Sequence, residues 1–287
     1  HFLGSTSTTA YAASECLGKL FSRKDIREKD YMERFVDWAI QEISIGKDDQ
    51  LKSFFVTGLF SALDHIFKLL AREELMKVVE VVYKALFKTD FNCFANSIGT
   101  VRHNRTKLAQ RMALTILRPK VCTWMHRRTK KSLLDNFKGK LDTTLVQTNV
   151  ALFNIKTEKK EEKHKEEDEG LDDDVDLDIL EDLIGFIFDS LKDKETVIRW
   201  TAAKSIGRIT QRLDLDLAND IVNEIIDTFL HAGENEWHGG LMALGELSRR
   251  GLLLPENLSR IIHILKRGLI FEVSQGTYTT GSNVRDA

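Results

Sequence analysis

Only a few side chains in this sequence have types and spacings that suit chemistry. Cys122 and His126 are four residues apart and would share one helix face, as two metal ligands do. No further ligands accompany them, so packing or solvent exposure is the favoured interpretation. The nucleotide patterns G-x-x-x-x-G-K-[ST] and G-x-G-x-x-G and the zinc pattern H-E-x-x-H do not occur. We therefore predict no catalytic residue, no metal and no cofactor.

A cluster of unusual composition lies at Trp237, His238, Gly239 and Gly240. Two glycines inside a predicted helix cost about 1 kcal/mol each relative to alanine, so some interaction must offset them. Close packing between helices is the favoured interpretation. Contact with the backbone of a partner is the alternative, and it makes these four residues candidates for partner binding, together with Arg285.

Charged residues are distributed unevenly along the chain. A basic stretch from Arg118 to Lys131 could contact phosphate or an acidic protein surface, although a solvated helix end explains it as well. An acidic stretch follows, for which a solvated spacer is favoured over docking to a basic partner. Isolated arginines such as Arg199 have no preorganised polar site around them. We predict that the protein is not an enzyme.

Helices must position these residues, because apolar residues recur at helical spacing through most of the chain. Met32, Val36 and Ile40, for example, share one face. Short links between the helices favour antiparallel pairs. The predicted helices cover residues 8–22, 30–45, 50–70, 72–88, 100–117, 119–136, 177–191, 195–211, 215–231, 235–250 and 255–270.

The most informative stretch is LKDKETVIRWTAAKSIGRI, which has the residue types of the second helix of a HEAT repeat. Asp193 can accept backbone N–H groups before the helix, Val197 and Ile198 would face the layer below, and Arg199 can reach the neighbouring repeat. Small residues allow close helix approach. The stretch recurs about 38 residues later, which aligns Arg199 with Trp237, and Thr100–Leu117 is a looser copy. The repeat-structural candidates are Asp193, Val197, Arg199, Ala203, Gly207 and Gly245.

This periodic return predicts an all-α solenoid of HEAT or armadillo type, built from antiparallel helix pairs, rather than a simple helical bundle. We expect an N-terminal helical block at 1–155, a charged and disordered linker at 156–176, and C-terminal repeats at 177–287. The linker composition, KTEKKEEKHKEEDEGLDDDVD, offers almost nothing to bury.

The overall composition excludes several classes of protein. Hydrophobic residues make up 42% and charged residues 30% of the 287 residues, which describes a soluble chain. The formal charge of -2 argues against a protein that coats nucleic acid, and no apolar run approaches the about 20 residues of a membrane span. Three widely spaced cysteines indicate a reducing compartment.

Because the sequence lacks an initiator Met and its last residues, GSNVRDA, look like the start of a helix, we expect a fragment.

Three stretches resemble the tubulin-folding cofactor D family: KDKETVIRWTAAKSIGRIT, ENEWHGGLMALGELSRRGLLLPENL and GSNVRDA. MERFVDWAIQEIS and LTILRPKVCTW are more weakly similar. The resemblance implies a long HEAT superhelix in the cytoplasm. Association with microtubules or the centrosome is a further implication of it. The resemblance also implies binding of β-tubulin, and assembly or dissociation of the αβ heterodimer with cofactors C and E and an Arf-like small GTPase.

A HEAT scaffold of another pathway, in nuclear transport or phosphatase assembly, is the alternative, because function resides in the surface and not in the repeat. Both functions are protein binding. The sequence does not assign the contact surface, the affinity or the oligomeric state.

Overall fold

The computed structural model describes residues 2–4, 7–27, 29–45, 53–88, 98–119, 177–228, 233–275 and 278–287. Residues 1–119 and 173–287 form one compact unit. Residues 120–136 of the predicted helix at 119–136, with Cys122, His126 and most of the basic stretch, lie outside the described residues. So does the predicted linker at 156–176.

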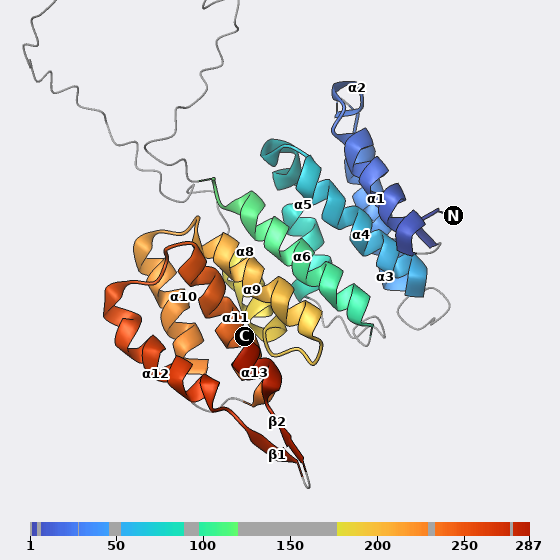
Figure 1. Ribbon diagram of the computed structural model, residues 1–287. Helices are drawn as coiled ribbons and strands as arrows, with labels where there is room; N and C mark the ends of the chain where they lie inside the picture. The colour runs from blue at the N-terminus through green and yellow to red at the C-terminus, as the bar shows by residue number, and fades with distance from the viewer. Residues whose placement is uncertain are drawn as a thin grey trace, which may run out of the picture. The chain divides into compact units, whose positions relative to one another are not determined.

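Helices dominate the described residues (Figure 1), and the fold class predicted from the sequence is confirmed. The long helices are α1 (Ser7–Phe21), α3 (Tyr31–Ile45), α4 (Ser53–Leu69), α5 (Arg72–Tyr83), α6 (Gly99–Ile116), α8 (Leu177–Ser190), α9 (Thr196–Thr210), α10 (Leu215–Thr228), α11 (Glu234–Arg249) and α12 (Leu258–Leu269). Shorter elements are the 3-10 turns Phe2–Gly4 and Pro255–Asn257, the helices α2 (Lys24–Arg27) and α13 (Ser282–Asp286), and a π-helical turn at Lys84–Lys88.

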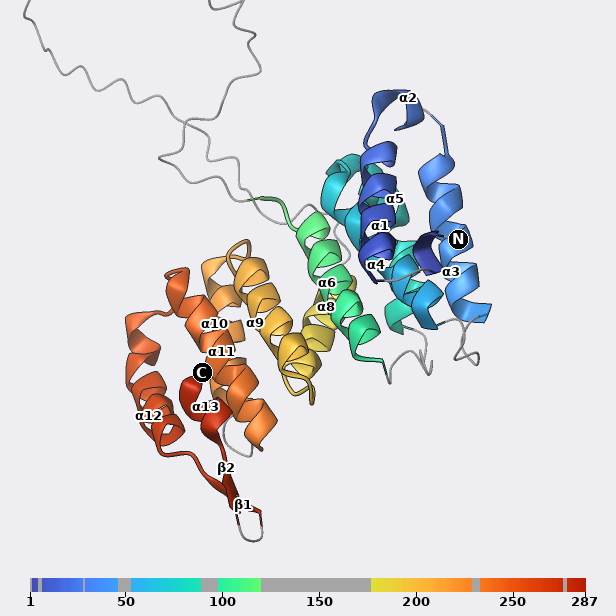
Figure 2. The ribbon, with the colours of Figure 1, turned by 45° about the vertical axis from the view of Figure 1, so that its right-hand side comes forward.

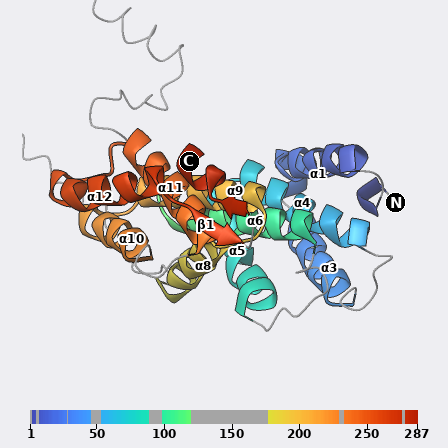
Figure 3. The ribbon, with the colours of Figure 1, turned by 60° about the horizontal axis from the view of Figure 1, so that its bottom comes forward.

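The helices form antiparallel pairs in two rows. One row, which we call row B, consists of α1, α4, α6, α9, α11 and α13, and each of these helices packs against the next. The other, row A, consists of α3, α5, α8, α10 and α12, and these helices pack in order against α4, α6, α9, α11 and α13. Figure 3 shows α3, α5, α8 and α10 on one side of α4, α6, α9 and α11. This is the two-layer arrangement of a helical repeat array.

Row B is the more deeply buried row, because its central helices have neighbours on three sides. In α9, only one stripe is accessible, and Ile198, Ala202, Ile206 and Ile209 are at most 2% exposed. The equivalent face of α6 buries Val101, Leu108, Ala109, Met112 and Ala113. Burial of each large aliphatic side chain contributes about 1.5–3 kcal/mol to folding.

Helix ends follow the expected chemistry in α11. Glu234 and Glu236 lie in its first turn and Arg249 in its last, where each charge favours the helix dipole. Gly251 follows with a φ of 70°, and the Leu252 N–H returns to the Leu247 carbonyl at 3.0 Å. This is a Schellman-type end, which requires the left-handed backbone that glycine adopts most easily.

A small hairpin between α12 and α13 is absent from the helices predicted from the sequence (Figure 2). Its strands β1 (Val273–Gln275) and β2 (Tyr278–Thr280) are antiparallel, with Val273 opposite Thr280. Thr280 donates to the Glu234 carboxylate at 2.9 Å, which fastens the hairpin to the start of α11.

Candidate protein-binding surface

Arg199 lies at the start of α9 and is only 3% exposed. Its guanidinium donates to the Asp193 carbonyl at 2.6 Å and to Thr196 Oγ1 at 3.0 Å within its own helix pair. It also donates to Asn235 Oδ1 at 2.9 Å and to His238 Nδ1 at 3.0 Å in α11. Burial lowers the pKa of Arg199, and Asp193 opposes this effect. Arg199 therefore connects two successive helix pairs.

The Asp193 carboxylate lies in the turn between α8 and α9, where it accepts the Glu195 N–H at 2.8 Å. It also accepts Arg102 Nε from α6 at 2.8 Å, and Arg102 Nη2 donates to Glu195 at 2.7 Å. Arg102 therefore connects α6 to the start of α9, as Arg199 connects α9 to the start of α11. Arg102 is not among the repeat-structural candidates predicted from the sequence, although it lies in the looser copy at the position that matches Arg199.

A second set of arginines makes similar connections at the opposite helix ends. Arg72 Nε donates to the Thr115 carbonyl at 2.8 Å, and Arg212 Nη1 donates to the Leu117 carbonyl at 3.0 Å. Arg250 Nη1 donates to Gln211 Oε1 at 2.7 Å. Carbonyl groups in a last helical turn have no partner within their helix, so Arg72 and Arg212 satisfy such carbonyls at the end of α6. Arg72 does so within the α5–α6 pair, whereas Arg212 and Arg250 link neighbouring pairs.

The small residues predicted to allow close helix approach differ in their surroundings. Ala203 is fully buried. A Cβ at Gly207 would lie 2.9 Å from Arg250 Nε and 3.3 Å from Glu246 Cβ, so α9 and α11 are in close contact there. A Cβ at Gly245 would meet nothing within 4 Å, which shows that Gly245 is not at a close contact in this structure.

The inward position predicted for Val197 is wrong. Val197 is 58% exposed, and Ile198, at 1%, faces the core instead. The reason is that Arg199 must point toward α11, which rotates its neighbour Val197 onto the accessible stripe of α9.

The cluster at Trp237–Gly240 is buried, so we reassign these four residues from partner binding to packing. A Cβ at Gly239 would overlap the Leu191 carbonyl oxygen. Trp237 lies beside Phe271, with ring centroids 5.2 Å apart, and His238 accepts from Arg199. Arg285 is different: it is exposed, donates to the Phe271 carbonyl at 2.8 Å and lies 3.6 Å from Glu272.

The accessible faces of α6 and α9 carry matching side chains, which we call the basic surface. Each helix presents an aromatic or imidazole ring, a lysine and an arginine at positions i, i+4 and i+8. In α6 these are His103, Lys107 and Arg111, and in α9 they are Trp200, Lys204 and Arg208.

Contacts between the two helices fix this register. Thr201 Oγ1 and His103 Nδ1 are 3.0 Å apart, and Ser205 Oγ donates to Gln110 Oε1 at 2.9 Å. The two stripes therefore run along neighbouring helices, and Arg208 is close enough to Arg111 to act on its charge. We call the three pairs of matching positions rungs: His103 and Trp200, Lys107 and Lys204, and Arg111 and Arg208.

Charge on the basic surface is only partly compensated. Arg111 Nη1 lies 2.7 Å from Asp64 Oδ1 of α4. Within the described ranges, Lys107, Lys204 and Arg208 form no ion pair, and Lys204 Nζ lies 3.4 Å from the centre of the Trp200 ring. Burial lowers the pKa of His103 to about 4, so its imidazole is neutral at pH 7. The surface thus combines net positive charge with an exposed aromatic ring, which suits an acidic protein partner.

Asp64 supplies a test of these electrostatics. Burial raises the pKa of its carboxyl to about 6, although Arg111, Lys107 and Lys68 oppose the rise. The folded state therefore binds the proton more tightly than the unfolded state, and this stabilising contribution, complete below the unfolded pKa, is lost as pH rises through about 6. We compare the unfolding free energies of Asp64→Asn and the wild type by urea denaturation. Between about pH 4.5 and 7.5, their difference should change by about 2 kcal/mol in favour of Asp64→Asn. A pH-independent difference would contradict the raised pKa.

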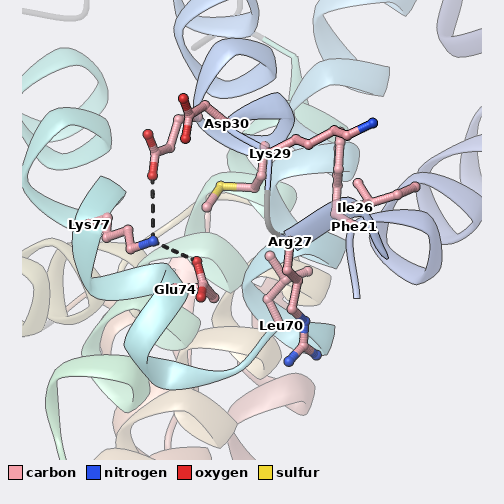
Figure 4. Close-up of a pocket in the computed structure, with 10 residues that line it drawn as sticks. Phe21, Ile26, Arg27, Lys29, Asp30, Leu70, Glu74 and Lys77 are labelled. Carbon is pink, nitrogen blue, oxygen red and sulfur yellow. Dashed lines mark hydrogen bonds and ion pairs between the residues drawn. The ribbon is translucent and has the colours of Figure 1, made fainter. Parts of the chain in front are cut away.

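Two pockets among the described residues are smaller than a typical small-molecule site, which has about 300–1,000 Å³. Figure 4 shows one between α1, α2, α3 and α5, where Lys77 pairs with Glu74 at 2.9 Å and Glu33 at 3.8 Å, and where Phe21, Ile26 and Leu70 also line the pocket. Its volume of about 20 Å³ has room for roughly one water molecule. A larger pocket of about 160 Å³ lies between α6 and α8, and its Arg102 is already bonded to Asp193.

No group of three His, Cys, Asp or Glu side chains in the described residues could hold a metal ion. No helix there has the length and apolar character needed to cross a membrane.

The chain is similar in sequence to known proteins. A family model described as "Tubulin-specific chaperone D-like, ARM repeats" matches residues 100–287. Tubulin-specific chaperone D of Dictyostelium discoideum is 33% identical over 293 aligned residues, which cover 96% of this chain and 19% of that protein. Tubulin-folding cofactor D of Schizosaccharomyces pombe is 32% identical over 123 residues, covering 38% of this chain and 11% of that protein. No solved structure matches the chain.

The chain thus spans about a fifth of the length of its Dictyostelium relative. The family match covers α6 to α13, which include both arginine connections and the basic surface. The chain belongs to the tubulin-specific chaperone D family.

Proposed function

We propose that this chain is part of a cytoplasmic tubulin-folding cofactor that binds β-tubulin and helps to assemble or dissociate the αβ heterodimer. The observation that carries the proposal is the similarity over 96% of the chain to a tubulin-specific chaperone. The basic surface is consistent with it, since the surface of tubulin is acidic and charge complementarity speeds association. Tubulin-folding cofactors C and E and an Arf-like small GTPase are the further proposed partners, and microtubules or the centrosome are further proposed sites of action.

The proposed role is binding rather than catalysis. Arg199 is buried and donates to Asn235 and His238, so its guanidinium is engaged in packing between helices. Any GTP hydrolysis stimulated in the assembly would then belong to tubulin. A GTPase assay of the full-length protein should show activity only when tubulin is present. Hydrolysis without tubulin would contradict the binding role.

The partner assignment is tested with the full-length protein, because this chain is a fraction of its relatives' length. We expect a pull-down from cell extract, analysed by mass spectrometry, to recover tubulin and an Arf-like GTPase as the leading partners. Purified full-length protein should also co-elute with β-tubulin in gel filtration. Recovery of nuclear-transport cargoes or phosphatase subunits instead would leave the repeat fold standing and overturn the proposed function.

A further inference from the structure

The rungs of the basic surface have a regular spacing that specifies the shape of a ligand. Four residues of an α-helix rise about 6 Å, so the lysine rung and the arginine rung lie about 6 Å apart along α6 and α9. On the other side of the lysine rung, the Cα positions of His103 and Trp200 lie about 6 Å further along the helices. The Lys204 ammonium itself reaches back over the Trp200 ring, at 3.4 Å from its centre. Neighbouring helices pack with axes about 8–10 Å apart, so a single narrow chain could contact both helices at once.

An extended peptide has a matching repeat. Alternate residues of a β-strand point to the same side, and they are about 6.6–6.8 Å apart. A strand aligned with α6 and α9 would therefore place residues i, i+2 and i+4 over three successive rungs. Two acidic side chains would meet the cationic rungs, and a third, apolar or aromatic, would lie against Trp200.

We propose that the basic surface holds an extended acidic segment of a partner protein, with carboxylates two residues apart at the Lys107/Lys204 and Arg111/Arg208 rungs. An apolar or aromatic side chain, two residues from the nearer carboxylate, occupies the His103/Trp200 rung. The proposal rests on the proposed function and deepens it, since it specifies the kind of segment that tubulin would present.

The charges on this surface favour a carboxylate ligand over a nucleic acid. Lys107, Lys204 and Arg208 are the cations without an ion pair among the described residues of the two stripes, while Arg111 is already shared with Asp64. Three cations give weak binding to a phosphate backbone, which needs many simultaneous contacts. The formal charge of the chain, -2, adds no long-range attraction for nucleic acid.

The decisive experiment measures binding of short fluorescent peptides to the 287-residue chain by anisotropy at low salt. One peptide has the order Trp-Ser-Glu-Ser-Glu, and the other has the same composition with its two glutamates adjacent. An extended chain directs adjacent side chains to opposite sides, so only the first can reach both cationic rungs. We expect the first peptide to bind about fivefold more tightly, the value of one lost exposed ion pair. Equal binding, no binding, or tighter binding of a short RNA would overturn the proposal.

Two double variants make the location testable. Lys204→Glu with Arg208→Glu should weaken binding of the first peptide by about tenfold or more. Lys24→Glu with Lys266→Glu makes the same charge change at exposed positions of α2 and α12, and should leave binding within about twofold. Equal weakening by both pairs would show non-specific attraction and overturn the proposal.

Failure of the acidic-segment inference can be told apart from failure of the proposed function. If the full-length protein co-elutes with tubulin and the Lys204→Glu/Arg208→Glu variant does so equally well, the inference fails and the proposed function stands. If the alternating peptide binds as expected but tubulin does not co-elute, the inference stands and the proposed function fails.

Discussion

Replacement of Arg199 by alanine is expected to lower the free energy of unfolding by about 3–5 kcal/mol. The side chain is 3% exposed and donates to four acceptors in two helix pairs. Alanine would leave the Asp193 carbonyl, Asn235 and His238 without this donor in a space that water enters poorly. Arg199→Lys should recover little of the loss, because an ammonium group cannot reproduce the planar fork of a guanidinium.

The measurement is urea denaturation followed by far-ultraviolet circular dichroism. Arg260→Ala is the matched control, because Arg260 also links neighbouring helices, through Asn223 at 3.0 Å and Asp227 at 2.7 Å, but on the exposed surface. Its loss should cost no more than about 1 kcal/mol. Similar losses in the two variants would mean that Arg199 contributes no more than a surface link.

The sequence was sufficient to predict the repeat architecture, because its signals are local. Apolar spacing within each segment marks a helix, and short links force successive helices to pair. The stretch with Asp193 and Arg199 carried the further signal that the pairs repeat. Each of the ten long helices in the described residues lies at a predicted position, with ends that differ by at most five residues.

The sequence was insufficient for the orientation of individual side chains in row B. A helix with neighbours on three sides has no broad polar face, so its rotation is set by contacts with other helices. Val197 shows the consequence, since the helix turns it outward while Arg199 bonds to α11. Arg102 was missed for a related reason, because its partner Asp193 is distant in sequence and adjacent only after the pairs stack.

The glycines of α11 show how structure separates two interpretations that sequence leaves open. In the sequence, Gly239 and Gly245 are both helix-interior glycines that invite a packing explanation. In the structure, only Gly239 has one, because its Cα faces the backbone of Leu191 at the end of α8. The basic surface is another feature that sequence leaves open, because its three rungs arise only when α6 and α9 pack side by side.

Gly239→Ala is expected to destabilise the protein by about 3–4 kcal/mol. The added Cβ would overlap the Leu191 carbonyl oxygen, and neither this backbone group nor the backbone of α11 can rotate away as a flexible side chain could. Relief would require α11 to move away from the α8–α9 turn. That movement would disturb the bonds from Arg199 to Asn235 and His238 as well.

Gly245→Ala makes the same chemical change six residues further along the same helix, but it is expected to stabilise the protein instead of destabilising it. Its Cβ would meet nothing within 4 Å, so the gain in helix propensity should stabilise the protein by about 0.5–1 kcal/mol. Both variants can be compared by thermal and urea denaturation under one set of conditions. Because intrinsic propensity is the same at both positions, the difference between them isolates the contact with Leu191. Equal effects would mean that α11 does not approach the end of α8 as closely as the structure shows.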